Sequence, residues 1–76
     1  MKLKLFESVA LTRDIPERGL RAGDHGAVVE IYDDRAVEVE FFEDSGHTKA
    51  VETVYIADLR RIESGERHSL KTPTTE

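Results

Sequence analysis

The sequence has no cysteine and no tryptophan, and only two prolines and two tyrosines. Without cysteine, neither a disulfide nor a thiolate metal site can stabilise the chain, and a reducing cytoplasm is the expected setting. Charged residues break the apolar pattern of the opening segment MKLKLFESVALTRD too early for a signal peptide, and no apolar run approaches membrane-spanning length. We therefore expect a cytoplasmic protein with no membrane partner.

The length of 76 residues limits the chain to one small domain. We predict a domain over residues 1–63 and a polar C-terminal tail over residues 64–76. Residues 1–63 contain nine Lys and Arg against fourteen Asp and Glu, so the predicted domain carries the entire net charge of −5. This negative excess disfavours a nucleic-acid partner, because phosphate binding depends on Lys and Arg.

Alternating apolar and polar residues predict five short strands, at residues 9–13, 27–32, 36–42, 48–56 and 60–62. Gly19 and Gly23 predict a structured loop with positive φ angles, anchored by Leu20. Residues 57–59 predict one helical turn before the last strand, whereas the Leu3–Phe6 segment fits either a strand or a helical turn. The pattern predicts an all-β fold, a small five-stranded antiparallel SH3-like barrel whose closure removes free sheet edges.

Two of the predicted strands form a hairpin within GDHGAVVEIYDDRAVEVEFFE, with a three-residue loop at residues 33–35. On the core side, the expected register pairs Ile31 with Val37, Val29 with Val39, and Ala27 with Phe41. On the outer side, it pairs Tyr32 with Ala36, Glu30 with Glu38, and Val28 with Glu40. The hairpin therefore places like charges opposite each other.

The register of the strand at residues 48–56 stays open. An even loop sets Ala50 and Val54 toward the core but also turns Glu52 inward, whereas an odd loop turns three other residues inward: Val51, Thr53 and Tyr55. A bulge near Glu52 would reconcile the two arrangements. In either case Lys49 is expected near the end of the acidic strand pair, where it would neutralise part of the charge.

The opposed glutamates suggest a binding surface. Directly opposed like charges destabilise a sheet, so either solvent, salt and nearby cations screen them or a basic partner relieves them. Two aromatic residues share the acidic side, and aromatic residues are enriched at interface hot spots. The predicted partner-binding residues are Glu30, Tyr32, Glu38, Glu40 and Phe42. The alternative is that the N-terminal segment or the tail covers the aromatic residues.

The sequence offers little material for catalysis or metal binding. No serine lies in a nucleophile-elbow motif, and carboxylates on an open sheet side keep pKa values unsuited to acid–base catalysis. His25 and His47 lie beside different predicted turns and His68 lies in the tail, without the spacing of a zinc site. We therefore predict a protein that is not an enzyme and that has no cofactor and no metal.

Several short motifs resemble a family of small prokaryotic proteins known as DUF4926, a domain of unknown function. The motifs lie between Phe6 and Ile62 and comprise Leu20-xx-Gly23-Asp24-x-Gly26-x-Val28-Val29-Glu30-x-Tyr32, Val37-Glu38-Val39-Glu40-Phe41, Gly46-x-Thr48 and Asp58-Leu59-Arg60. The resemblance implies an SH3-like barrel and supplies no assigned catalytic residue to transfer. In this family a second small gene often lies beside the first, which would suit a complex of two proteins.

Together these patterns predict a non-enzymatic protein-binding module that presents an acidic, aromatic-dotted sheet face to a basic protein surface. Two alternatives remain. The first is an RNA- or DNA-contacting barrel that uses an arginine cluster, comprising Arg13, Arg18, Arg21, Arg60 and Arg61. The second is a self-associating structural subunit that pairs through a free sheet edge or the tail.

Overall fold

The computed structural model of the protein describes residues 1–63, and its elements lie close to the predicted ranges. They are β1 (Ser8–Leu11), η1 (Pro16–Arg18), β2 (His25–Ile31), β3 (Ala36–Phe42), β4 (Thr48–Tyr55), η2 (Ile56–Asp58) and β5 (Leu59–Arg61). The all-β class and the helical turn before the last strand are confirmed. The predicted tail lies outside the described residues. Within residues 1–63, the helical segments are each three residues long, too short to cross a membrane.

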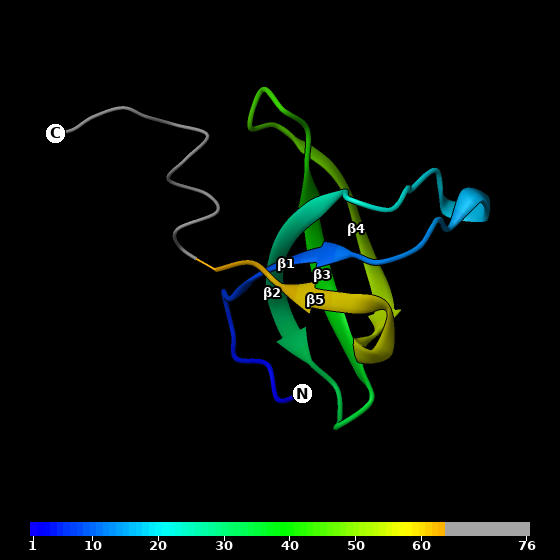
Figure 1. Cartoon of the computed structure of the whole chain (residues 1–76). Helices are drawn as coiled ribbons and strands as arrows, with labels where there is room; N and C mark the ends of the chain where they lie inside the picture. Colours follow the sequence, from blue (N-terminus) through cyan, green and yellow to red (C-terminus); the bar gives the residue numbers. More distant parts are fainter. Residues whose placement is uncertain (64–76) are drawn as a thin grey trace, which may run out of the picture.

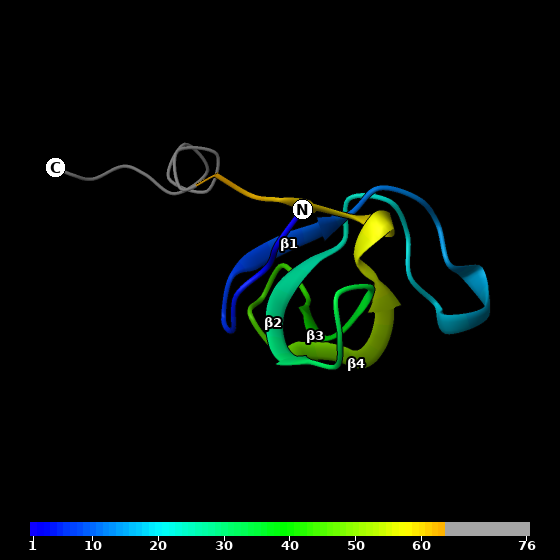
Figure 2. The ribbon, with the colours of Figure 1, turned by 90° about the horizontal axis from the view of Figure 1, so that it is seen from below.

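The five strands form one antiparallel sheet in the order β4-β3-β2-β1-β5. The sheet curls around its interior, and η2 leads directly from the end of β4 into β5 (Figures 1 and 2). Within residues 1–63, no strand pairing joins β4 to β5, so the prediction of a barrel closed by hydrogen bonds is wrong. The three residues of β5 pair with β1, so β4 and β5 are the two edge strands of the sheet.

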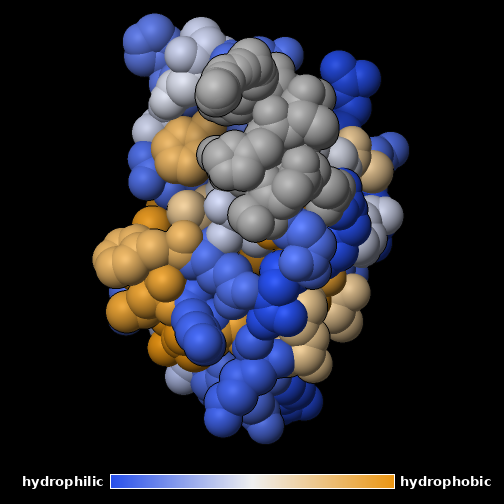
Figure 3. Space-filling view, turned by 60° about the vertical axis from the view of Figure 1, so that its left-hand side comes forward, coloured by the Kyte–Doolittle hydropathy of each residue, from blue (hydrophilic) through white to orange (hydrophobic). Residues whose placement is uncertain are grey.

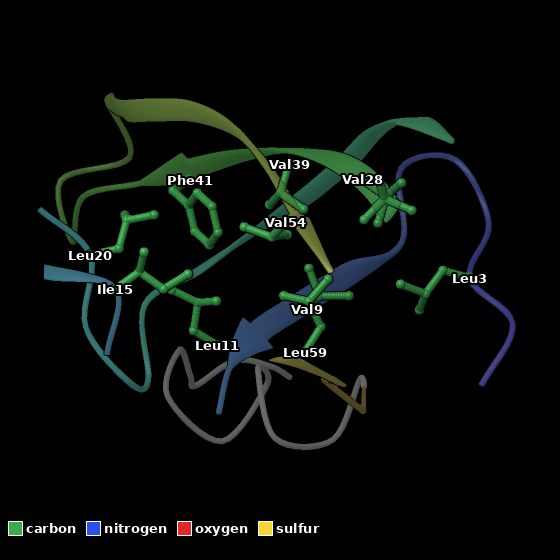
Figure 4. Packing of buried hydrophobic residues seen from close by; sticks show 11 residues of the cluster. Leu3, Val9, Leu11, Ile15, Leu20, Val28, Val39, Phe41, Val54 and Leu59 are labelled. Atoms are coloured by element: carbon green, nitrogen blue, oxygen red, sulfur yellow. The ribbon is translucent and has the colours of Figure 1, made fainter. Parts of the chain in front are cut away.

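The core fills the concave side of the curled sheet (Figure 4). Val37, Val39 and Phe41 of β3 are fully buried, which confirms the predicted alternation of that strand. Leu20 is also fully buried, which confirms its predicted role as the anchor of the loop after η1. At the opposite end of the core from Leu20, Leu3 of the N-terminal segment packs near Val28 (Figure 4).

A β-bulge divides β2 into two parts. Near the hairpin loop the predicted register is correct, since Ile31 pairs with Val37 and Glu30 pairs with Glu38. The register shifts between Val28 and Glu30, so that Val28 rather than Val29 pairs with Val39. The prediction that Val28 faces outward is therefore wrong: it is fully buried, whereas Ala27 and Val29 are only partly buried. The extra residue of the bulge reverses the side-chain phase of the strand.

Gly26 lies at a close approach between β2 and β3. A Cβ atom at this position would lie 2.1 Å from the main-chain oxygen of Glu40 and 2.9 Å from the Cα atom of Phe41. Both atoms belong to the backbone of the paired strand, so neither can move aside as a side chain would. The close approach therefore requires glycine, and it fixes how tightly β2 crosses β3.

The structure selects the even register for β4. Ala50 pairs with Phe41 and Val54 pairs with Val37, while the register shift lies at the start of the strand rather than near Glu52. Glu52 consequently lies on the core side, opposite Val39, where its carboxylate accepts a hydrogen bond of 2.7 Å from Arg18. The same guanidinium lies 3.4 Å from the main-chain oxygen of Thr53. An inward charge and a covering arginine both hinder the addition of a further strand to this edge.

The N-terminal segment ends in a tight turn over Lys4–Glu7, rather than in a strand or a helical turn. The Glu7 amide donates to the Lys4 oxygen at 3.2 Å, and the Phe6 amide donates to the Val28 oxygen at 2.6 Å. Arg61 of β5 donates to the Glu7 carboxylate, and this ion pair lowers the pKa of Glu7. Phe6 has a φ of 69° and a side chain 74% exposed. A left-handed backbone is costly for a bulky residue, and here no burial of the ring offsets that cost.

Replacement of Gly26 by alanine should destabilise the protein by about 1–3 kcal/mol, the usual cost of forcing an extra group into a packed site. The added methyl group meets the backbone of β3, so the two strands must separate locally. Urea denaturation of the wild-type protein and of Gly26→Ala measures the difference. A stability equal to that of the wild type would contradict the close approach of β2 to β3.

Replacement of Phe6 by asparagine should leave stability unchanged or raise it by up to about 1 kcal/mol, because asparagine tolerates the left-handed region better than phenylalanine. The matched control is Leu3→Ala in the same segment. Leu3 is buried in the core, so its truncation should cost about 2–5 kcal/mol. Thermal denaturation of both variants tests the pair. A large loss of stability in Phe6→Asn would show that the exposed ring contributes to the fold.

Candidate functional site

The five predicted partner-binding residues lie on the outer, convex side of β2, β3 and the loop between them. Along β3, the buried residues alternate with Glu38, Glu40 and Phe42. Glu30 of β2 pairs with Glu38 of β3. Tyr32 follows β2 and donates its amide hydrogen to the Ala36 oxygen at 3.1 Å. The even register of β4 adds three outward residues. We call the combined surface the acidic face, comprising Glu30, Tyr32, Glu38, Glu40, Phe42, Val51, Thr53 and Tyr55.

The acidic face is elongated, with aromatic side chains near both ends. Tyr32 lies beside the first residue of β3 and Phe42 is the last residue of that strand, so about 20 Å of strand separates them. Tyr32 is 51% exposed and Tyr55 is 66% exposed. Phe42 is only partly buried, and its ring centroid lies 6.5 Å from that of His25. The structure thus unites Tyr32 with Glu30 and Glu38, while Phe42 lies at the far end.

Hydroxyl groups, rather than cations, stabilise two of the three glutamates. One carboxylate oxygen of Glu38 accepts hydrogen bonds from the Tyr32 hydroxyl at 2.6 Å and from the Thr53 hydroxyl at 3.0 Å. These donors lower the pKa of Glu38, and the bond with Glu38 raises the pKa of Tyr32. The Thr48 hydroxyl donates to Glu40 in the same way. Hydrogen bonds from neighbouring hydroxyl groups therefore partly offset the repulsion between the glutamates.

The prediction that Lys49 neutralises the acidic strand pair is wrong. Its ammonium group lies 2.8 Å from the Asp24 carboxylate, in an ion pair outside the acidic face. Within the described part of the chain, Glu30, Glu38 and Glu40 take part in no ion pair, and the Glu30 side chain also lacks a hydrogen bond. The face therefore keeps three uncompensated negative charges.

Among the arginines considered for nucleic-acid binding, Arg13, Arg18 and Arg61 pair with acidic residues on different elements. Arg18 pairs with Glu52 of β4, Arg61 pairs with Glu7, and Arg13 pairs with Asp58. Among the two described histidines, His25 packs beside Phe42, whereas the His47 ring lies 3.0 Å from the Ser45 hydroxyl. His68 lies outside the described residues. Over residues 1–63, no three potential metal ligands converge.

Sequence reasoning missed the contribution of β4 to this surface. Thr53 supplies a hydrogen bond to Glu38, and Val51 and Tyr55 add exposed apolar area. Their orientation depends on the register of β4, which periodicity alone left open. A usable signal was the hydroxyl content of the flanking strand, because threonine opposite glutamate is a favourable cross-strand pair.

Replacement of Tyr32 by phenylalanine should destabilise the protein at neutral pH but much less at about pH 3. The pKa of Glu38 is lowered in the folded state, so its contribution is present above the unfolded-state pKa and is lost as the pH falls through the folded value. Urea denaturation at the two pH values measures this difference, and an NMR titration should show the Glu38 pKa rising in the variant. Tyr55→Phe is the control, because that hydroxyl makes no hydrogen bond among residues 1–63. An equal loss of stability at both pH values in Tyr32→Phe would contradict the hydrogen bond between Tyr32 and the ionised Glu38 carboxylate.

Comparison with known protein families identifies the chain. Residues 5–61 match the family described as a domain of unknown function, DUF4926. This range contains all five strands and the whole acidic face. No curated protein and no solved structure matches the chain. Since the match covers most of the sequence, the protein belongs to the DUF4926 family.

Proposed function

We propose that the protein is a non-enzymatic protein-binding module that presents the acidic face to a basic surface on a partner protein. The observation that carries this proposal is the uneven use of charge. The acidic face contains three glutamates and no lysine or arginine, whereas neighbouring cations pair with acids elsewhere. A basic partner would supply the compensating charge that the described part of the chain does not.

The hydrogen bonds of the acidic face suit such an interaction. The Tyr32 and Thr53 hydroxyls hold the Glu38 carboxylate in one place, so less side-chain entropy is lost when a partner cation binds. Exposed Tyr32 and Tyr55 offer aromatic area beside the charges, and arginine or lysine stacks favourably on such rings. The negative charge would also accelerate the encounter with a basic partner at low salt.

Three finer assignments belong to the same proposal. The strand order supports an open version of an SH3-like sheet. The lack of cysteine supports a cytoplasmic setting. The small size of the protein and its unpaired acidic face support assembly with another small protein, such as one encoded by a neighbouring gene.

The test compares three tagged proteins in pull-downs from host extract at near-physiological salt, with and without nuclease. They are the wild type, a face variant with Glu30→Gln, Glu38→Gln and Glu40→Gln, and a control variant with Glu17→Gln, Asp34→Asn and Asp44→Asn. The control removes the same charge from exposed residues outside the acidic face. We expect a protein partner that survives nuclease and binds the control normally, but binds the face variant at least about tenfold more weakly.

Two results would contradict the proposal. Equal binding of the partner to the face variant and to the control would show that the acidic face is not the site. Recovery that depends on nucleic acid, and that weakens steeply with added salt, would instead favour the arginine residues as the binding surface.

A further inference from the structure

One stretch of β2 has a strand on only one side. The pairing between β1 and β2 ends with Ser8 opposite Ala27, and the Lys4–Glu7 turn extends it only to Val28. From Val29 to Ile31, no strand within residues 1–63 pairs with this side of β2, although Glu30 and Ile31 still pair with β3 on the other side. These residues therefore form an open sheet edge at the C-terminal end of β2.

The main chain of Ile31 points toward this open edge. The Tyr32 amide donates to the Ala36 oxygen, which puts these two residues at a hydrogen-bonding position of the β2–β3 ladder, although the Ala36 amide donates to the Asp33 side chain. In an antiparallel ladder such pairs alternate with non-hydrogen-bonded ones, so the amide and oxygen of Ile31 face away from β3. Its side chain is 40% exposed, although that of its partner Val37 is fully buried. Ile31 thus offers both backbone hydrogen bonds and apolar area.

The Lys4–Glu7 turn adds apolar area next to this edge. The Phe6 amide bonds to Val28, immediately before the open stretch, and the turn lies beside β2 in both ribbon views (Figures 1 and 2). Leu5 is 51% exposed and Phe6 is 74% exposed. Figure 3 shows a group of apolar side chains on the left of the molecule, near and just below mid-height, with hydrophilic side chains beneath it. The left-handed backbone of Phe6 is kept without any gain in burial, which points to a role outside folding.

We propose that the open edge of β2 accepts an extended segment of the partner protein, with alternating apolar and basic residues, as an additional strand. The proposal rests on the proposed function and specifies how the partner binds. Side chains of an added strand alternate between the two sides of the sheet. On one side, apolar residues pack near Ile31 and the Leu5–Phe6 turn. On the other side, basic residues reach Glu30, which has no ion pair or side-chain hydrogen bond within residues 1–63.

Charge selects this partner over a second copy of the chain. Two copies joined edge to edge through β2 would bring their acidic faces side by side, with a net charge of −5 on each chain. Pairing of β2 with the free edge of β4 in another copy would have to displace Arg18, which contacts both Glu52 and the Thr53 oxygen. A basic segment meets neither obstacle.

The test uses two synthetic peptides of identical composition. In the first, lysine alternates with valine and isoleucine; in the second, the lysines form one block and the apolar residues another. NMR titration of the full chain at low salt follows binding, and amide hydrogen exchange reports whether the Ile31 amide becomes hydrogen-bonded. We expect the alternating peptide to bind at least about tenfold more tightly than the block peptide and to slow exchange at Ile31 at least about tenfold.

Two variants serve as controls. Ile31→Pro removes the edge amide at a position where proline is tolerated, so it should abolish the preference for the alternating peptide but retain binding of the block peptide. Phe6→Ser removes exposed apolar area without opening the core, so it should selectively weaken binding of the alternating peptide. This variant tests the proposal even if Ile31→Pro does not fold. Thermal denaturation checks the fold of each variant.

The outcomes separate the two proposals. Equal binding of both peptides, with signals changing at Glu38 and Glu40 but no protection of Ile31, would overturn strand addition and leave the acidic face as the site. If neither peptide binds at low salt, both proposals are contradicted. Light scattering that shows self-association of the wild type but not of Ile31→Pro would replace the basic partner with a second copy.

Discussion

The bulge at Val29 is the constraint on which both sides of the sheet depend. Beyond it, Glu30 faces outward opposite Glu38; before it, Val28 faces inward opposite Val39. A regular strand could not satisfy both requirements, because its side chains alternate strictly, and continuing the hairpin register would turn Val28 outward. The extra residue thus maintains a continuous core and an unbroken row of outer carboxylates. It also bends β2 at the point where β1 turns away from it.

The electrostatic design of the molecule separates two ways of stabilising a carboxylate. Acids near the edges and loops form ion pairs, as Glu52 does with Arg18 and Asp24 does with Lys49. On the convex side, Glu38 instead accepts hydroxyl hydrogen bonds, which favour the charged form without cancelling the charge. Exposed ion pairs contribute little to stability, but each of them neutralises a lysine or arginine side chain. The three glutamates of the acidic face therefore keep their charge without an ion pair among residues 1–63.

The sequence predicted features that depend on local pattern and failed where distant contacts decide. The alternation of β3 and the anchoring role of Leu20 were predictable, because each follows from neighbouring residues. The bulge was not, since consecutive apolar residues at Val28 and Val29 allow either phase. Lys49 was assigned to nearby glutamates, whereas its partner Asp24 comes from a loop distant in sequence. Closure of the sheet likewise depends on whether β4 pairs with β5, which the periodicity of each strand does not determine. Of the acidic face, the β2–β3 half was predicted and the β4 half was not.

The contact of Arg18 with β4 also bears on how many molecules can assemble. A sheet with two accessible edges can act as a link, receiving a strand on one side and offering one on the other, so that identical units polymerise. Here the β4 edge carries an inward carboxylate and an arginine over its carbonyl, while β2 is open over only three residues. A further strand at β4 would have to displace Arg18, so a segment bound at β2 would not lead to continued pairing through the β4 edge.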